Sequence, residues 1–165
     1  MTDTTLSKTL PPTLLSVRTQ PLFTLKLEMI GVLAVGDTPA ASRRVGLVAG
    51  GRFEGERLSG QVLPGGSDWQ HLRADGALAL DVRLHLQTDE GELIIMRYQG
   101  LRHGPADMLA RIDRGEAVDP GNYYFRIAPQ FETASERLGW LNRILAVGIG
   151  HRPPDGPVYN LFEVL

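Results

Sequence analysis

The stretch GALALDVRLHLQT, residues 76–88, gives the clearest strand signal in the chain. Every second position is leucine or valine, so one face would carry Leu78, Leu80, Val82, Leu84 and Leu86. Successive side chains of a strand point to opposite faces, and a face made only of aliphatic side chains must be buried. The other face carries Asp81, Arg83 and His85, which fits either bulk water or the polar lumen of a barrel. A small barrel with a ligand-sized interior uses both faces in this way.

Short apolar segments recur along the chain between many of its 19 glycines and 11 prolines, a pattern typical of all-β proteins. The first covers residues 21–35, and another is predicted to break at Gly50-Gly51 and to resume near 52–58. A hairpin turn is expected at 89–91. Further strands are predicted over residues 92–101, 123–131, 140–148 and 158–165. Roughly eight to ten strands fit a sandwich or a closed barrel, and we favour a small antiparallel β-barrel, up-and-down and lipocalin-like in outline.

Residues 105–114 depart from the strand pattern. Met108, Leu109 and Ile112 stand at helical spacing after Pro105, and the segment ends near Gly115. This spacing predicts one short helix near 105–114, which could cap one end of the barrel. The Thr, Ser and Pro content of residues 1–18 predicts a flexible leader that can drape over the domain or over a partner subunit. We assign residues 19–165 to a single β-barrel domain.

The composition excludes several classes of protein. The net charge is −2 with acidic and basic residues mixed along the chain, so no basic stripe indicates nucleic acid. The absence of cysteine excludes disulfides and thiolate sites and is compatible with a cytoplasmic location. The sequence shows neither the pattern of a signal peptide nor an apolar run of about 18 residues that would span a membrane. We therefore expect a cytoplasmic protein without membrane or nucleic-acid partners.

Three stretches resemble one protein family in combination: GGSDWQHLRADGALALDVRLHLQTDEGELI (65–94), YYFRIAPQFET (123–133) and WLNR (140–143). They are similar to the DUF3237 family, also called UPF0311, of small bacterial and fungal proteins. The resemblance extends from about Pro21 to the C-terminus. It implies a compact antiparallel β-barrel that is usually oligomeric, with no generally established activity. One turn residue, Glu90, stands where the family pattern has an aspartate, and this puts no functional residue in doubt.

The first candidate positions lie in the strand regions before residue 86. Asp68 and Trp69 follow a glycine pair, so Trp69 can line the mouth of a pocket with Asp68 as an acid or base beside it. Alternatively, Asp68 caps backbone N–H groups while Trp69 closes a barrel end. Asp81 is a candidate base or ligand anchor if its face of the strand points into the lumen, which the resemblance favours. If that face points to water, Asp81 is a solvated charge.

The stretch YYFRIAPQFETASERLGWLNR, residues 123–143, supplies the other candidates. Strand alternation places Tyr124 and Arg126 on one face, and Pro129 is expected to bend or end the strand. Trp140 and Asn142 share a face of the next predicted strand. We expect Arg126, Tyr124, Trp69, Trp140 and Asn142 to bind the ligand in one cavity, with Glu132 and Asp81 as catalytic carboxylates. A structural ion pair between Arg126 and Glu132 is the alternative.

These residues favour a protein that binds a small carbonyl-bearing or aromatic molecule and needs no cofactor. An aromatic ring stacks on a planar ligand, and an arginine pairs with a carboxylate or enolate. If the protein is an enzyme, proton transfer is the accessible chemistry: isomerisation, cyclisation or hydration. The four histidines show no metal-ligand spacing, so no metal site is predicted. The alternative is a non-catalytic binding or assembly protein, and in either case we expect a homo-oligomer because strand edges and the apolar C-terminus would be exposed.

Overall fold

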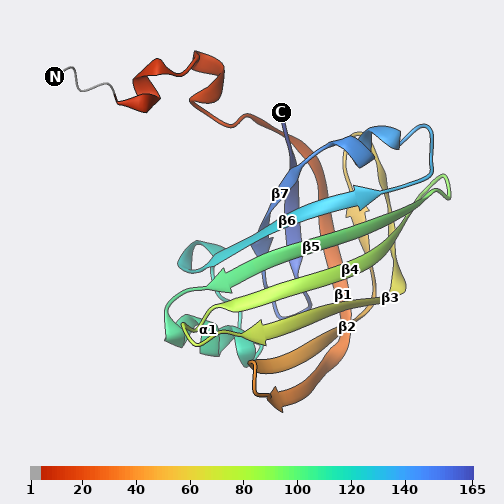
Figure 1. Cartoon of the computed structure of the whole chain (residues 1–165). Coiled ribbons are helices and arrows are strands. Elements are labelled where there is room, and N and C mark those ends of the chain that lie inside the picture. Colours follow the sequence, from red (N-terminus) through yellow and green to blue (C-terminus); the bar gives the residue numbers. More distant parts are fainter. Residues whose placement is uncertain (1–4) are drawn as a thin grey trace.

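The strands pair in the order of the sequence, and the last closes on the first, so the sheet forms a closed antiparallel barrel (Figure 1). The structure is a computed structural model that describes residues 5–165. Within this range the strands are β1 (Thr19–Asp37), β2 (Ser42–Glu54), β3 (Ser59–Leu72), β4 (Leu78–Thr88), β5 (Leu93–His103), β6 (Tyr124–Glu132), β7 (Ala146–His151) and β8 (Val158–Val164). The up-and-down β-barrel predicted from the sequence is confirmed.

One α-helix, α1 (Ala106–Asp113), lies between β5 and β6 at one end of the barrel (Figure 1). It begins directly after Pro105 and is followed by Gly115, whose φ of 77° lies in the left-handed region that favours glycine. The short helix predicted near 105–114 is confirmed. The remaining helical turns are of the 3-10 type: η1 (Leu6–Thr9), η2 (Pro12–Leu14), η3 (Pro120–Asn122) and η4 (Gly139–Arg143).

Side chains fill the lumen of the barrel. The aliphatic face of β4 points inward, and Val82, Leu84 and Leu86 are fully buried. Aromatic rings from other strands complete the core, with Tyr98 and Phe125 both packed edge-on against Tyr159. Along most of its length the lumen is therefore a packed core with no room for a ligand.

The predicted break at Gly50-Gly51 was wrong, because β2 continues through both glycines and turns only after Glu54. Gly50 and Gly51 lie opposite Glu28 and Leu27 of β1. A Cβ atom on Gly51 would collide with the Lys26 carbonyl oxygen, and the φ of 145° is one that other residues rarely adopt. These glycines allow close approach of two strands instead of forming a turn.

The strand predicted at residues 140–148 was also wrong. Residues 140–148 do not form one strand, because η4 covers the first part and β7 begins at Ala146. Pro129 does not end β6, which continues to Glu132. β6 pairs with β7 only at Arg126 and Ile127, so the edge toward β7 is unpaired at Pro129 and can accept a residue without an N–H group.

The N-terminal arm, residues 5–18, extends away from the barrel (Figure 1). Its large apolar side chains are exposed: Leu6, Leu10, Leu14, Leu15 and Val17. Residues 1–4 of the predicted leader lie outside the described part of the chain. None of the helices in residues 5–165 is both long and apolar enough to cross a membrane.

Candidate functional site

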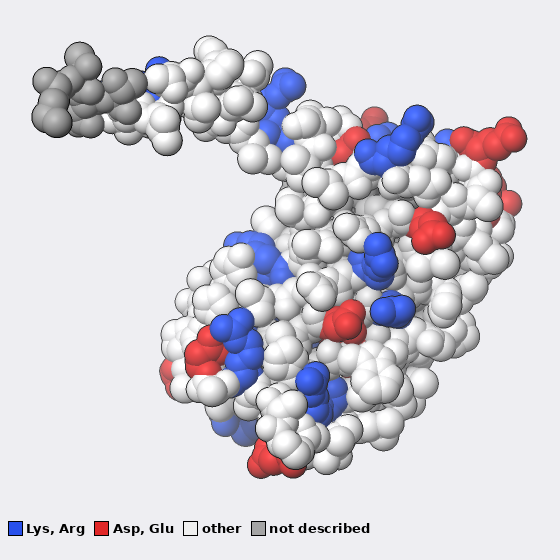
Figure 2. Space-filling view, viewed as in Figure 1, with Lys and Arg blue, Asp and Glu red and all other residues white. Residues whose placement is uncertain are grey.

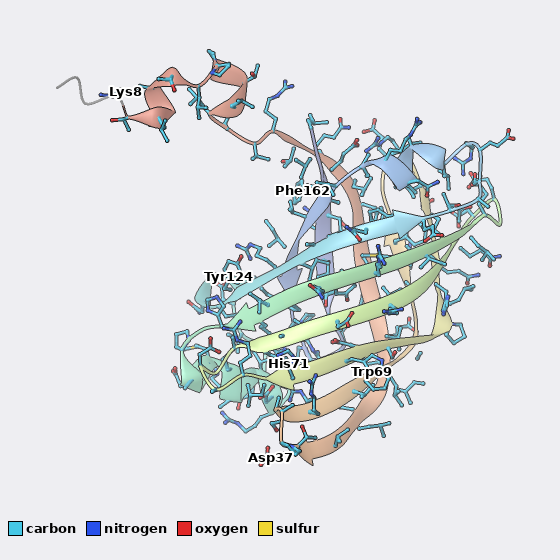
Figure 3. The ribbon with its side chains drawn as sticks, in the orientation of Figure 1. Lys8, Asp37, Trp69, His71, Tyr124 and Phe162 are labelled. Atoms are coloured by element: carbon cyan, nitrogen blue, oxygen red, sulfur yellow. The ribbon has the colours of Figure 1, made fainter. Side chains whose placement is uncertain are left out.

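A groove of about 1000 Å³ runs across the outer face of the barrel, lined mainly by β3 to β8 with Thr19 of β1 and Arg43 of β2. Four residues predicted for the site line it: Trp69, Asp81, Tyr124 and Arg126. Trp69 and Tyr124 lie on the same side of the barrel as His71 (Figure 3). Side chains of both charges are interspersed on this side, and no large patch of one sign forms (Figure 2). The groove is therefore a mixed aromatic and polar surface.

The rings of the groove are held by neighbouring side chains. The imidazole of His103 stacks on the ring of Tyr124, with 4.7 Å between the ring centres. The guanidinium of Arg126 lies 4.9 Å from the centre of the same ring and donates a hydrogen bond to the Phe125 carbonyl, at 2.9 Å. Trp69 donates its indole N–H to Ser67 Oγ, at 2.9 Å. Planar surfaces of this kind can stack on an aromatic ligand.

The placement of Asp81 in the lumen was wrong. Asp81 is exposed on the outer face of β4, whose opposite face is made only of aliphatic side chains. In a closed barrel the uniformly apolar side of a strand points inward. The polar side of β4 therefore points outward and meets water. Asp81, Arg83 and His85 are all exposed, as the alternative interpretation of this strand allowed.

The prediction that the candidates share one cavity was also wrong. Glu132 and Asn142 line a separate pocket of about 350 Å³. Asn142 ties a loop together, since it accepts a hydrogen bond from Thr133 N at 2.8 Å and donates one to Thr133 O at 2.9 Å. The guanidinium carbon of Arg57 lies over the ring of Trp140, 4.1 Å from the centre of that ring. The 3-10 turn η4 replaces the expected strand and places Trp140 and Asn142 away from the groove.

The alternative of an ion pair between Arg126 and Glu132 was wrong as well. The two residues stand six positions apart on the continuous strand β6, which separates them by roughly 20 Å. Glu132 is exposed at the far end of that strand. Neither a shared site nor a structural clamp can form between these two side chains.

A second polar cluster lies inside the barrel. The sequence patterns did not predict that its residues lie together. Asp68, Tyr98 and Arg102 point inward, with 7%, 2% and 7% of their surfaces exposed. Asp68 Oδ1 and Arg102 Nε have no hydrogen-bond partner among the described residues, whereas the Tyr98 hydroxyl lies beside that of Tyr159, which is also buried. Buried polar groups are nearly always hydrogen-bonded, and unpaired ones cost free energy. Asp68, Tyr98, Arg102 and Tyr159 therefore form a buried polar cluster in which a carboxyl oxygen and a guanidinium N–H lack partners.

Burial changes the protonation of this cluster. Removal from water raises the pKa of Asp68 to about 6, against an ordinary value of 3.8, although a hydrogen bond from Gln70 and the charges of Arg102 and Arg44 favour the ionised form. Burial also raises the pKa of Tyr98 well above its usual value, and the negative charge of Asp68 acts in the same direction. Near neutral pH the Asp68 carboxyl therefore exchanges readily between its two forms.

Side chains connect this cluster to a cavity of about 400 Å³ beneath α1. Gln70 donates to Asp68 Oδ2 and accepts a hydrogen bond of 2.6 Å from Arg44 Nε. Asp113, in the last turn of α1, lies 3.2 Å from the guanidinium of Arg102 and 3.7 Å from that of Arg44. Arg44, Arg102 and Asp113 all line the cavity. Two arginines therefore stand between the cavity and the buried carboxyl.

Part of this cluster could have been predicted from the sequence. Asp68 was considered as an acid or base, but only as a neighbour of Trp69, which points to the opposite face. In LIIMRYQGLRH, residues 93–103, alternation places Tyr98 and Arg102 on the same face as Ile94 and Met96. A strand whose apolar face ends in tyrosine and arginine indicates a polar layer near one end of a core.

Comparisons with known proteins agree with the fold. Residues 17–164 match the family model described as "Protein of unknown function (DUF3237)". A UPF0311 protein from Rhodopseudomonas palustris is 36% identical over 150 residues, which are 91% of this chain and 98% of that protein. A UPF0311 protein from Clostridium acetobutylicum is 30% identical over 146 residues, 88% of this chain and 92% of that protein.

Solved structures give the same picture. The crystal structure of a conserved protein of unknown function from Rhodopseudomonas palustris has a TM-score of 0.88 at 35% identity, covering 91% of this chain and 99% of that one. A β-barrel-like protein from Acinetobacter baumannii has a TM-score of 0.80 at 37% identity, covering 94% and 99%. An enzyme from Penicillium herquei shares the fold, with a TM-score of 0.69 at 21% identity, covering 90% and 95%. The chain belongs to the DUF3237 family, whose curated relatives carry the name UPF0311.

Proposed function

We propose that the protein catalyses proton transfer on a small carbonyl-bearing molecule, with Asp68 as the acid and base. The observation that carries this proposal is the burial of Asp68, Tyr98 and Arg102 together, with Asp68 Oδ1 and Arg102 Nε unpartnered. A core built only for stability would not leave a carboxylate and a guanidinium short of hydrogen bonds. Such sites often sacrifice stability for poised groups.

The proposed step is an enolisation. The Asp68 carboxylate removes a proton from the carbon beside the carbonyl, and the electron pair of that C–H bond moves to the carbonyl oxygen. Tyr98 O–H and Arg102 Nε–H then donate hydrogen bonds to the developing enolate, which is stabilised because its donors are fixed in a dry environment. The protonated Asp68 returns the proton to the same or another carbon. The step requires only these acid–base and hydrogen-bonding groups.

The cavity beneath α1 favours a small substrate that carries a carboxylate next to its carbonyl. Arg44 and Arg102 present two guanidiniums to the cavity, and a guanidinium pairs with a carboxylate in planar geometry. Both currently face Asp113 of α1. A substrate carboxylate would replace Asp113 as their partner and bring the carbonyl toward Asp68, with α1 moving aside to admit it.

Hydrogen–deuterium exchange tests this proposal with defined probes. In deuterated buffer, the wild-type protein is expected to accelerate exchange at C3 of 2-oxobutyrate, measured by proton NMR. Butanone, which lacks the carboxylate, should exchange much more slowly. Asp68→Asn should lose about 100-fold or more of the acceleration, the usual contribution of a general base. No acceleration of 2-oxobutyrate exchange by the wild-type protein would contradict the proposal.

Asp81→Asn and Glu132→Gln serve as comparison variants. The sequence predicted that both carboxylates are catalytic. In the structure both are exposed on the outer face. We expect both variants to retain the exchange activity. If Asp68→Asn is unaffected, loss of activity in Asp81→Asn would move the chemistry to the outer groove, and loss in Glu132→Gln would move it to the pocket that Glu132 lines.

The outer groove supports a second candidate function, which is binding of a planar aromatic acid without catalysis. Trp69, Tyr124 and Arg126 present two rings and a guanidinium within one groove of about 1000 Å³. Stacking and charge pairing are the interactions such a ligand requires. Naphthoate titrated against the tryptophan fluorescence should then quench Trp69, and Trp69→Leu with Trp140 retained should abolish the response.

A further inference from the structure

The second half of β1 has a free strand edge. β8 pairs with β1 from Thr19 to Lys26 only, and the Leu27 N–H donates to the Pro157 carbonyl at 3.0 Å. Beyond Leu27 the strand continues to Asp37 and, among residues 5–165, pairs with β2 on one side alone. The ribbon formed by residues 29–37 of β1 and 42–47 of β2 extends past α1 at the lower end in Figure 1. One row of backbone donors and acceptors is left unpaired along its outer edge.

This free edge carries apolar side chains on both faces of the strand. Every residue from Ile30 to Asp37 is exposed, so alternation does not hide an apolar face. The large apolar members are Ile30, Val32, Leu33 and Val35. No charged side chain lies between Glu28 and Asp37. Natural sheets protect free edges with charges, prolines or short strands, and an apolar edge without them is a site for pairing with another chain.

Irregular pairing limits the segment that can accept a new strand. The register between β1 and β2 shifts near Met29 and again between Ala34 and Gly36. Between these bulges Gly31 to Ala34 pair regularly with residues 47 to 44 of β2. A bulge bends a strand and disrupts its ladder, so the regular centre is the part that can pair.

The N-terminal arm, as far as the structure describes it, lies away from this edge. The arm leaves β1 at Thr19, whereas Asp37 lies at the opposite end of the molecule from Lys8 (Figure 3). Gly31 to Ala34 are 12 to 15 residues along β1 from Thr19, roughly 40–50 Å of extended strand. Residues 5–18 span about the same length only when fully extended, so this part of the arm does not pair with the edge in the structure.

We propose that this edge pairs with the same edge of a second copy of the chain. Two identical strands in antiparallel orientation are related by a twofold axis, so one surface serves both copies. The uncharged segment between Glu28 and Asp37 brings no like charges into the centre of such a pair. Pairing satisfies the backbone groups of both edges and brings the apolar side chains of the two strands side by side on each face of the joined sheet.

The ribbon that forms the proposed interface also contributes to the wall of the cavity beneath α1. Ala34 and Gly36 of β1 and Ser42 and Arg44 of β2 line that cavity. A second copy paired with the ribbon therefore fixes one wall of the cavity and the β2 segment that carries Arg44. The pairing itself is independent of the proposed chemistry and is tested separately.

Light scattering after size-exclusion chromatography tests the interface. We expect the wild-type protein to run at twice the mass of one chain. The double variant Val32→Lys with Leu33→Lys, one lysine for each face, should be monomeric at the same concentration. The matched control is Val147→Lys with Ile149→Lys, which adds two lysines to exposed apolar positions of β7 and should remain dimeric. A monomeric wild type, or equal effects of both pairs of lysines, overturns the proposal.

Engineered cysteines give a second readout, because the chain has no cysteine of its own. Single cysteines at Val32, Leu33 and Ala34 should form disulfide-linked dimers on oxidation. The yield should peak at the position nearest the twofold axis and decrease on either side. An Ile149→Cys protein should give little covalent dimer. Removal of residues 1–16 should leave the dimer intact, and a monomer after this truncation would identify the arm as the true contact.

Discussion

Replacing Asp68 with asparagine is expected to raise the stability of the barrel at pH 8 while removing its exchange activity. Burial raises the pKa of Asp68 from 3.8 to about 6 in the folded protein. Each pKa unit corresponds to about 1.4 kcal/mol, so the buried carboxylate destabilises the fold by about 3 kcal/mol at pH 8. Asparagine removes the charge and keeps an oxygen that can accept the hydrogen bond from Gln70. The gain corresponds to roughly 5–10 °C in melting temperature for a chain of this length.

The sign and the pH range of this effect follow from the raised pKa. Between pH 4 and 6 the folded protein binds more protons at Asp68 than the unfolded chain does, so stability falls as pH rises through this range. Above about pH 6 the buried Asp68 carboxylate lowers the free energy of unfolding by its full amount. The stability difference between Asp68→Asn and the wild type should therefore be greatest at pH 8 and close to zero near pH 4. Urea unfolding at several pH values measures it.

Asp81→Asn is the control for this measurement, because Asp81 is exposed on the outer face of the adjacent strand β4. It should show no comparable rise in stability between pH 4 and 8. If Asp68→Asn instead unfolds more easily at every pH, Asp68 is a structural anchor for Arg102 and Arg44. The proposed catalytic role would then lose its physical basis.

Replacing Gly51 with alanine is expected to destabilise the barrel by about 3–5 kcal/mol, as overpacking and backbone strain act at the same position. The new Cβ atom would overlap the Lys26 carbonyl oxygen of β1, which is backbone and cannot rotate away. The φ of 145° adds strain because residues with a Cβ atom rarely adopt it. Thermal unfolding followed by circular dichroism measures the effect.

Gly139→Ala provides the matched control. Its Cβ atom would meet no atom within 4 Å, and its φ lies outside the positive region. The melting temperature of this variant should stay close to that of the wild type. A Gly51→Ala protein as stable as Gly139→Ala would show that β1 and β2 can move apart at this crossing without loss.

Much of the fold could be predicted because it depends on local patterns. The alternation over residues 78–86 identifies an inward face, and the structure buries it. Pro105 and Gly115 bracket the short helix correctly. Glycine was less informative, since Gly50-Gly51 has the composition of a turn but lies inside a strand. A glycine that permits close approach and a glycine that permits a turn look alike until the neighbouring strand is known.

The candidate site could be predicted only in part. Trp69, Asp81, Tyr124 and Arg126 do gather around one groove, because they occupy outward positions near the same level of neighbouring strands. Glu132, Trp140 and Asn142 lie elsewhere, because the strand expected at 140–148 is partly a 3-10 turn. Strand alternation gives the face of a residue within its own strand, but not which residues of other strands lie beside it.

By itself, the sequence favoured an antiparallel barrel over a sandwich, predicted one short helix, and determined which side chains of β4 and β5 share a face. These properties follow from the period of two in a strand and from the turn-forming residues between strands. Only the tertiary structure decided that the polar face of β4 meets water instead of a lumen, that Asp68 lies near Tyr98 and Arg102 inside the barrel, and that, among the described residues, the end of β1 pairs on one side alone. Closure of the sheet decides all three, because it fixes the inside, the register between strands and the point at which β8 ends against β1.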